Sequence, residues 1–140
     1  MSSTGGCYCG AIRYELSEPV AFSVNCHCRN CRLISGGAFV TVAAVKTSSF
    51  EITRGESKLR RYSSGPGDRF FCDECGGRLF SRGSSDEEYT NLLIATLDEE
   101  LQAAPICHIN VESKAPWYEI LDAIAQFDDL PDLSDPPDRE

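Results

Sequence analysis

Apolar residues along this chain mostly alternate with polar ones, and that alternation is the period of a β-strand rather than of a helix. Ile12, Tyr14 and Leu16 alternate with Arg13 and Glu15, so one face of an extended segment would be buried. Runs rich in β-branched and apolar residues predict further strands over 38–45, 69–71, 79–82, 89–96 and 106–112. The pattern therefore predicts about eight short strands and a mainly β fold of small antiparallel sheets.

One pair of strands is expected to form a hairpin. Residues 50–53 and 58–62 are both strand-like, and Arg54-Gly55-Glu56-Ser57 lies between them. Glycine supplies the backbone freedom that a tight turn requires. The sequence thus predicts that these two segments pair with each other.

Helix is expected in only two places. Residues 30–35 predict one helical turn, because a pair of glycines follows and can end it. Trp117, Leu121 and Ile124 have the i, i+4, i+7 spacing of a short amphipathic helix.

Length and charge limit the class of protein. The chain has 140 residues and a formal charge of -9, so a nucleic-acid backbone would be repelled. Six acidic residues and three prolines fall within residues 128–140, which predicts a solvated tail behind a single domain of residues 1–127. No leader-like or membrane-spanning apolar run is recognised, and we expect a cytoplasmic protein without a membrane partner.

Cysteine spacing carries most of the chemical information. Seven of the eight cysteines fall into three tight clusters, namely Cys7 and Cys9, then Cys26, Cys28 and Cys31, then Cys72 and Cys75. Such spacings place sulfurs on one side of a turn, as two corners of a zinc tetrahedron require. A disulfide framework fits poorly, because cysteines separated by one residue rarely reach disulfide geometry without strain.

The cysteines can be divided between metals in two ways. Cys7 and Cys9 with Cys72 and Cys75 would make one closed set of four, and Cys26, Cys28 and Cys31 would make a set of three. The alternative is one ribbon-like site of Cys28 and Cys31 with Cys72 and Cys75. The first division uses all seven cysteines and predicts two zinc ions, one structural and one with an open position.

A zinc ion held by three thiolates suits addition of a thiol to an aldehyde, because it can stabilise a thiolate and polarise a carbonyl. Two other interpretations stay open. His27, His108 or a water could complete the second site and leave a non-catalytic zinc module for protein contacts. Cys72 and Cys75 could also form a redox pair without metal.

The order of motifs resembles the family of glutathione-dependent formaldehyde-activating enzymes and centromere protein V. The matching segments are 5–14, 26–32, 71–77, 105–109 and 113–117, within a resemblance over about residues 5–127. The resemblance implies a mainly β fold of coiled sheets, similar to small zinc-binding Rab accessory proteins. It also implies a structural zinc on Cys7, Cys9, Cys72 and Cys75, and a catalytic zinc on Cys26, Cys28 and Cys31.

The activity implied by the resemblance joins glutathione to formaldehyde, and it is formally a carbon-sulfur lyase reaction. A small thiol and an aldehyde are thus the expected partners, with the reaction direction and oligomeric state left open. Arg29 and Arg32 are candidates for binding a substrate carboxylate or for offsetting thiolate charge. His27 is expected to point away from the cluster, and His108 to be a core histidine. The core is also expected to contain Cys107, Trp117, Tyr118 and Phe127.

Overall fold

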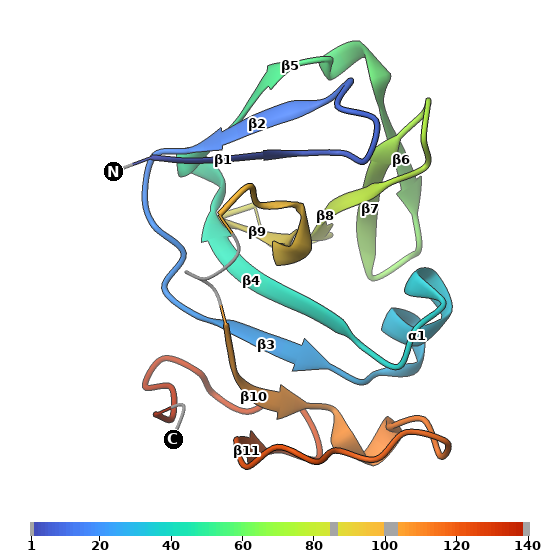
Figure 1. Cartoon of the computed structure of the whole chain (residues 1–140), viewed down its shortest axis with the longest axis vertical. Helices are drawn as coiled ribbons and strands as arrows, with labels where there is room; N and C mark the ends of the chain where they lie inside the picture. Colours follow the sequence, from blue (N-terminus) through green and yellow to red (C-terminus); the bar gives the residue numbers. More distant parts are fainter. Residues whose placement is uncertain (1, 85–86, 100–103, 139–140) are drawn as a thin grey trace. The chain divides into compact units, whose positions relative to one another are not determined.

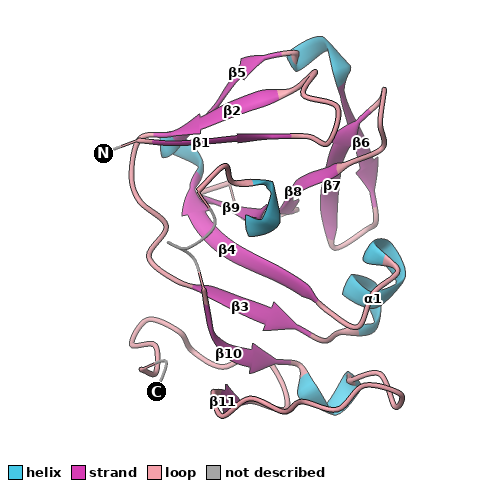
Figure 2. Cartoon of the chain, in the orientation of Figure 1, coloured by secondary structure: helices cyan, strands magenta, loops and turns pink. Residues whose placement is uncertain are grey.

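The computed structural model describes residues 2–84, 87–99 and 104–138, and most of its regular structure is β-strand (Figure 1, Figure 2). It confirms the prediction of a mainly β protein. The chain divides into two compact units. Unit 1 contains residues 1–21 and 43–103, and unit 2 contains residues 22–42 and 104–140.

Unit 1 begins with a three-stranded antiparallel sheet of β1 (Ser3–Gly6), β2 (Arg13–Leu16) and β5 (Phe50–Arg54), in the order β1-β2-β5. The alternation in β2 decides which face is buried. Tyr14 and Leu16 are almost completely buried, whereas Arg13 and Glu15 are partly exposed. The predicted strand over residues 12–16 is therefore confirmed.

The remaining strands of unit 1 follow the order β4-β9-β8-β7-β6. Their bounds are β4 (Val40–Lys46), whose first residues belong to unit 2, β6 (Leu59–Ser63), β7 (Gly67–Cys72), β8 (Arg78–Gly83) and β9 (Tyr89–Leu93). Phe70 and Phe80 stack with ring centroids 4.5 Å apart. Phe50 meets Phe80 edge-on at 4.8 Å, so aromatic packing joins residues of β5, β7 and β8 in one core.

Unit 2 has its own strands and its own smaller core. β10 (Pro105–Ile109) pairs in parallel with β3 (Ser23–Cys26) and with β11 (Ala125–Gln126), while β3 pairs antiparallel with the start of β4. The helix α1 (Arg29–Ser35) follows β3. The buried core members are Val24, Cys26, Cys107 and Ile109.

The predicted hairpin between residues 50–53 and 58–62 is wrong. Both segments are strands, but β5 pairs with β2 whereas β6 pairs with β7. Gly55 has φ 78°, and a Cβ there would lie 2.0 Å from the carbonyl oxygen of Ala11. The chain therefore passes Gly55 in close contact with residue 11 and enters a 3-10 turn over Glu56–Lys58 instead of folding back on β5.

One of the two helix predictions is confirmed and the other is wrong. α1 ends at Gly36, which has the left-handed conformation of a helix C-cap. Residues 117–124 form no helix, and the side chains of Trp117 and Leu121 are 70% and 82% exposed. Lys114 Nζ donates hydrogen bonds to the carbonyls of Ala115 and Tyr118, and two of the three apolar side chains that would stabilise a helix by packing are exposed.

Short 3-10 helices account for the other differences. They are Thr47–Ser49, Glu56–Lys58, Ile94–Thr96 and Val111–Ser113. The last two shorten the predicted strands over 89–96 and 106–112. Strands β1, β3 and β11 were not predicted, because none of them combines an alternating pattern with bounding turn residues.

The acidic segment after residue 127 has no helix or strand over its described residues, 128–138. Its first part is nevertheless held by unit 2. The N–H of Asn110 donates to the carbonyl of Asp129 at 3.1 Å, and Leu133 packs against the smaller core. A separate tail over 128–140 stays a prediction, with residues 139–140 outside the described part.

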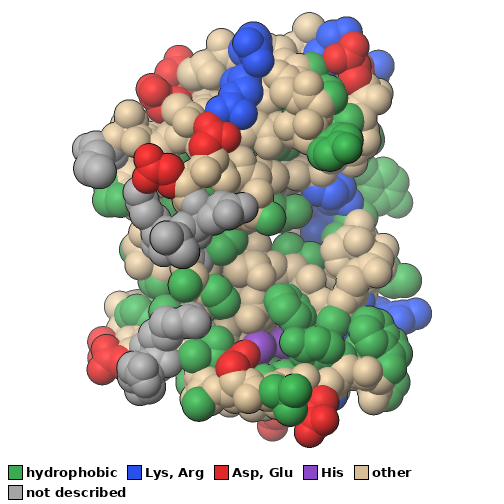
Figure 3. Space-filling view, in the orientation of Figure 1, with side chains coloured by type: hydrophobic (Ala, Val, Ile, Leu, Met, Phe, Trp, Pro, Cys, Tyr) green, Lys and Arg blue, Asp and Glu red, His purple; other side chains and the backbone are tan. Residues whose placement is uncertain are grey.

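Within the described residues, no helix is both long enough and apolar enough to span a bilayer. On the face in Figure 3, acidic and basic side chains are scattered among other side chains.

Candidate metal centres

Four sulfurs of unit 1 come together from two turns, and we call Cys7, Cys9, Cys72 and Cys75 the quartet. Their Sγ atoms all lie within 4.8 Å of one another. One turn follows β1, where the N–H of Gly10 donates to the carbonyl of Cys7 at 3.1 Å. The other follows β7, where the N–H of Gly76 donates to the carbonyl of Cys72 at 2.8 Å. Each turn therefore directs two sulfurs to the same side.

The spacing of these sulfurs matches a zinc tetrahedron. Cys7 Sγ and Cys9 Sγ are 3.7 Å apart, and Cys9 Sγ and Cys72 Sγ are 3.9 Å apart. A zinc–sulfur bond of about 2.3 Å gives a tetrahedral edge of about 3.8 Å. All eight cysteines are free thiols in the structure. The quartet is thus spaced for a shared metal rather than for disulfides.

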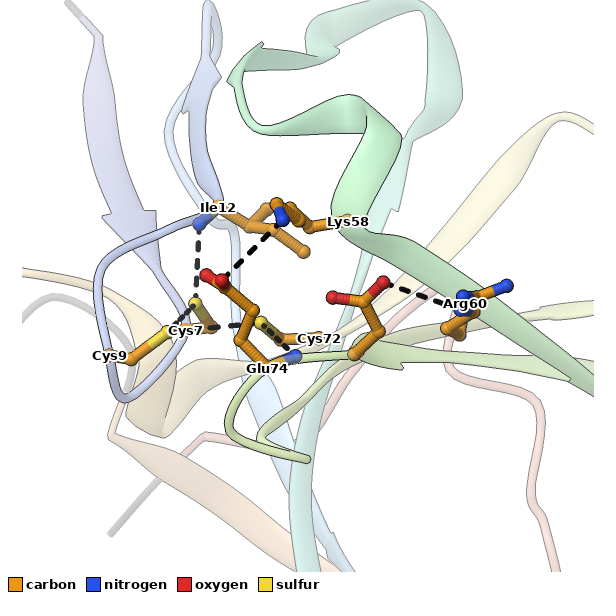
Figure 4. A network of polar contacts seen from close by, with 8 residues as sticks. Cys7, Cys9, Ile12, Lys58, Arg60, Cys72 and Glu74 are labelled. Carbon is orange, nitrogen blue, oxygen red and sulfur yellow. Dashed lines mark hydrogen bonds and ion pairs between the residues drawn. The ribbon is translucent and has the colours of Figure 1, made fainter.

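Backbone N–H groups surround the quartet and stabilise negative charge on sulfur. Ile12 N–H donates to Cys7 Sγ at 3.3 Å, Glu74 N–H to Cys72 Sγ at 3.4 Å and Gly77 N–H to Cys75 Sγ at 3.4 Å. In Figure 4, Glu74 also forms an ion pair with Lys58, and the adjoining Asp73 pairs with Arg60. These exposed ion pairs add little energy, but they connect the second turn to the segment 58–60.

The thiols of the quartet differ in pKa. Backbone N–H groups of Cys9 and Gly77 lower the pKa of Cys75 to about 6. The N–H of Ala11 lowers the pKa of Cys9, but desolvation and the neighbouring sulfurs outweigh it and raise that pKa to about 12. Four thiolates this close repel one another, and a divalent cation would relieve that repulsion.

The second group lies in unit 2 within one short segment, and we call Cys26, Cys28 and Cys31 the trio. Their Sγ atoms also lie within 4.8 Å of one another. Cys26 ends β3, Cys28 is the N-cap of α1 and Cys31 lies in its first turn. The N–H of Cys31 donates to Cys28 Sγ at 3.3 Å, so the start of the helix positions two of the three sulfurs.

Cys26 receives a different kind of partner. The side-chain amide of Asn110 donates to Cys26 Sγ at 3.3 Å, across 84 residues of sequence. The hydrogen bond from Cys31, together with those from the Cys28 N–H and Asn110, outweighs burial and lowers the pKa of Cys26 to about 5. Cys26 in turn raises the pKa of Cys31. Negative charge in the trio is therefore favoured on Cys26 over Cys31.

Neither histidine belongs to the trio. Within the described residues, no His, Asp or Glu atom joins the three sulfurs as a fourth member of the group. His27 instead points to β10, where its Nε2 lies 2.8 Å from Nδ1 of His108. His108 Nε2 lies 3.0 Å from a carboxylate oxygen of Asp122, so His108 has partners at both ring nitrogens. His108 is the buried, satisfied histidine that we expected.

Aromatic side chains and a pocket lie close to this histidine pair. The ring of Phe39 lies 5.0 Å and the ring of Tyr118 lies 6.2 Å from that of His27, between centroids. Burial and the neighbouring positive charges lower the pKa of His27 to about 4. An open pocket of about 530 Å³ is lined by Lys114, Pro116, Trp117, Tyr118, Glu119, Ile120 and Gln126.

The remaining residues named in the sequence analysis differ in how far they are buried. Arg29 is exposed, whereas the Nε of Arg32 is buried and has no hydrogen-bond partner among the described residues. Cys107 is fully buried, and Phe127 packs against the core of unit 2, as expected. Trp117 is exposed, so its prediction as a core residue is wrong.

Sequence reasoning missed Asn110, Asp122 and Phe39. An isolated Asn or Asp in a loop carries no signal of its own, because such residues are common at turns. Asn110 has φ 56°, the only positive φ of a non-glycine residue in the described part of the chain. That backbone conformation is not readable from the sequence.

Comparison with known proteins gives consistent matches. A sequence profile of the family described as glutathione-dependent formaldehyde-activating enzyme matches residues 2–113. A Halomonas elongata protein, named provisionally as such an enzyme, is 27% identical over 83% of this chain and 79% of its own length. A Penicillium rubens protein with the same provisional name is 32% identical over 81% of this chain. The chain spans 54% of that relative and 45% of one from Emericella nidulans.

A solved structure is similar in fold to about two thirds of this chain. The crystal structure of a Rhodobacter sphaeroides protein aligns with a TM-score of 0.57 and 27% sequence identity. The alignment covers 68% of this chain and 87% of that one.

Proposed function

The chain belongs to the family of glutathione-dependent formaldehyde-activating enzymes, and from this premise we propose that it adds a small thiol such as glutathione to formaldehyde or a related aldehyde. The reverse reaction uses the same site. A sulfur–carbon bond forms, the thiol loses its proton and the carbonyl oxygen gains one, so no oxidant or reductant is required. This chemistry is that of a carbon-sulfur lyase run in the direction of addition.

The difference in ligand number between the two cysteine groups carries the proposal. The quartet has the four sulfurs that close a tetrahedral zinc site, whereas the trio has three. The sulfur spacings of the quartet fit zinc, and the three sulfurs of the trio lie within 4.8 Å of one another and form no disulfide. We assign a structural zinc to Cys7, Cys9, Cys72 and Cys75, and a catalytic zinc to Cys26, Cys28 and Cys31.

Each part of the chain has a defined task in this scheme. Zinc bound at the trio would supply Lewis acidity and stabilise the substrate sulfur in its anionic form. Cys26, Cys28 and Cys31 act as ligands and not as nucleophiles. The start of α1 holds Cys28 and Cys31, while β3 and β10 hold Cys26. Arg29 and Arg32 follow the trio ligands in sequence and supply positive charge for a substrate carboxylate.

The proposal extends to the compartment in which the protein acts. Seven sulfurs held as metal ligands require a reducing environment, which the cytoplasm provides. We accordingly propose a cytoplasmic enzyme whose partners are a small thiol and an aldehyde.

Spontaneous addition of thiols to formaldehyde makes an ordinary rate assay insensitive. We would instead measure exchange between free glutathione and its hydroxymethyl adduct at equilibrium by two-dimensional exchange NMR. The zinc-loaded protein should accelerate this exchange above the spontaneous rate, and Cys28→Ser should return it to that rate. Equal exchange with and without the unaltered protein would disprove the proposed reaction for this thiol and aldehyde.

A non-catalytic zinc module for protein contacts is the second candidate. The exposure of Trp117 and Leu121 in unit 2 favours it, because large apolar side chains on a surface often mark an interaction site. Cobalt substitution separates the two candidates. Titration with small thiols should change the sulfur-to-cobalt charge-transfer band if the trio accepts a further ligand, and no thiol should change it in an inert module.

A further inference from the structure

Asn110 lies outside both cysteine groups, and its side chain donates a hydrogen bond to a sulfur of the trio. Backbone N–H groups donate to other sulfurs of the two groups. The amide of Asn110 lies 3.3 Å from Cys26 Sγ, and Cys26 is 7% exposed. A hydrogen bond to a shielded thiolate is stronger than one made in water, because a less polar environment screens the charge less.

The backbone of Asn110 is held in an unfavourable conformation for this contact. Its φ of 56° is in the left-handed region, where asparagine is tolerated better than most residues. The N–H of Asn110 donates to the carbonyl of Asp129, and its own carbonyl accepts from the N–H of Ser113 at 3.0 Å. These bonds fix the residue on both sides, as is typical where backbone strain serves a site.

The register of β3 and β10 explains why the side chain reaches the sulfur. Ile109 of β10 is paired with Cys26 of β3. Asn110 is the next residue after Ile109 and therefore lies close to Cys26. The N–H of His27 donates to the carbonyl of Ile109 at 3.0 Å, which fixes the two strands at this point. The backbone N–H of His27 is therefore already used, and the side chain of Asn110, which directly follows β10, donates to Cys26.

We propose that Asn110 is a positioning residue of the trio, which orients Cys26 and withdraws negative charge from its sulfur when the trio holds a metal ion. Less charge on the sulfur leaves the metal more electrophilic toward a fourth ligand. This inference rests on the metal-binding part of the proposed function. It adds a specific residue, in the segment directly after β10, that adjusts the trio and does not touch the quartet.

The test uses cadmium-113 NMR, which reports on sulfur ligands directly and requires neither thiol nor aldehyde. The full-length protein loaded with cadmium should give two resonances, one for each cysteine group. Asn110→Asp keeps the side-chain shape and removes the N–H donors. Asn110→Gly removes the amide and keeps the left-handed backbone accessible. Both variants should move the trio resonance and leave the quartet resonance in place.

Asn30→Asp is the matched control, because it makes the same chemical change at an exposed residue between Cys28 and Cys31. It should leave both resonances in place. The trio in Asn110→Gly should also hold zinc about 10-fold more weakly, as is typical when an outer partner of a metal ligand is lost. A quartet resonance at its normal position shows that unit 1 of a variant is still folded, and an unchanged circular dichroism spectrum shows the same for the whole chain.

A second measurement needs no variant at all. In the unaltered protein, a hydrogen bond to a metal-bound sulfur should give a proton–cadmium correlation from the Asn110 side-chain amide to the trio resonance. Absence of this correlation, or a trio resonance unchanged in both Asn110 variants, would overturn the inference and leave the proposed reaction standing. A single cadmium resonance in the unaltered protein would overturn both the inference and the two-metal assignment.

Discussion

The quartet and the trio use the same ligand, but the chain assembles them in opposite ways. The quartet joins two segments more than sixty residues apart, as the contact between Cys9 and Cys72 shows. The trio comes from a six-residue segment and takes its distant support from Asn110 instead. A metal in the quartet therefore closes a long loop of unit 1, whereas a metal in the trio occupies a site already shaped by β3 and α1. We expect the first to determine folding and the second to determine activity.

The largest effect should follow from breaking the quartet. Cys72→Ser should unfold the zinc-loaded protein, because structural zinc contributes about 10 to 16 kcal/mol of apparent binding energy in small metal-dependent folds. Circular dichroism and the zinc content per chain would measure this. Cys107→Ala is the control, since Cys107 is buried but belongs to neither group. A folded Cys72→Ser protein that retains two zinc ions would contradict the structural assignment.

Breaking the trio should have a smaller effect on folding and a complete effect on activity. Cys28→Ser should lower the zinc content from about two ions to about one and abolish glutathione exchange, while the thermal unfolding temperature changes little. The physical reason is that Cys28 closes no long loop. If Cys28→Ser and Cys72→Ser unfolded equally, the division between a structural and a catalytic site would be wrong.

The pair of His27 and His108 in unit 2 should contribute an intermediate amount to the free energy of unfolding. His108→Leu leaves the buried Nε2 of His27 without its partner, and an unsatisfied buried polar atom costs about 1 to 3 kcal/mol. Urea unfolding of the zinc-loaded protein would measure the loss. Asp122→Asn is the control, because this side chain is 48% exposed and the amide can still accept a hydrogen bond. Equal stability of His108→Leu and the unaltered protein would show that the pair is not structural.

The smallest effect on stability is expected at Asp98, which makes a surface contact with Arg13 and Thr4 in unit 1. Arg13 and Thr4 donate hydrogen bonds to Asp98 and lower the pKa of its carboxyl group. Because the folded pKa lies below the unfolded value of 3.8, Asp98 stabilises the protein above that pH and loses this contribution as the pH falls through the folded pKa. Asp98→Asn should lower stability near neutral pH by under about 1 kcal/mol.

Chemical denaturation at several pH values would test this prediction. The difference between Asp98→Asn and the unaltered protein should shrink as the solution is acidified below the ordinary carboxyl pKa. A difference that stays constant down to strong acid would show that the charge of Asp98 is not responsible.

Much of the fold was predictable from local patterns, because a half-buried strand imposes a period of two on its own residues. β2 was predicted in this way, β4, β7 and β8 were predicted from runs rich in β-branched and apolar residues, and α1 was predicted from the two glycines that follow it. Strand pairing was less predictable. Residues 50–53 and 58–62 have the pattern of a hairpin, yet Gly55 passes so close to Ala11 that the two strands join different partners.

The apolar spacing of Trp117, Leu121 and Ile124 was misleading for a related reason. A helical pattern indicates a helix only when a core is present for its apolar face, and most helical stability comes from such packing. Here Trp117 and Leu121 are exposed, and the carbonyls of Ala115 and Tyr118 accept hydrogen bonds from Lys114. The helical period is visible in the sequence, but the exposure of these side chains is visible only in the structure.

The sequence by itself determined that the sulfurs within each cluster lie close together, because cysteines one to three residues apart in a turn are close in space. Tertiary structure alone decided that Cys7 and Cys9 join Cys72 and Cys75, and it decided what surrounds each group. Asn110 reaches Cys26 across 84 residues, and His27 meets His108 across 81, through the parallel pairing of β3 with β10. Such contacts depend on strand register and on one left-handed residue, and no local pattern in the chain encodes either of these.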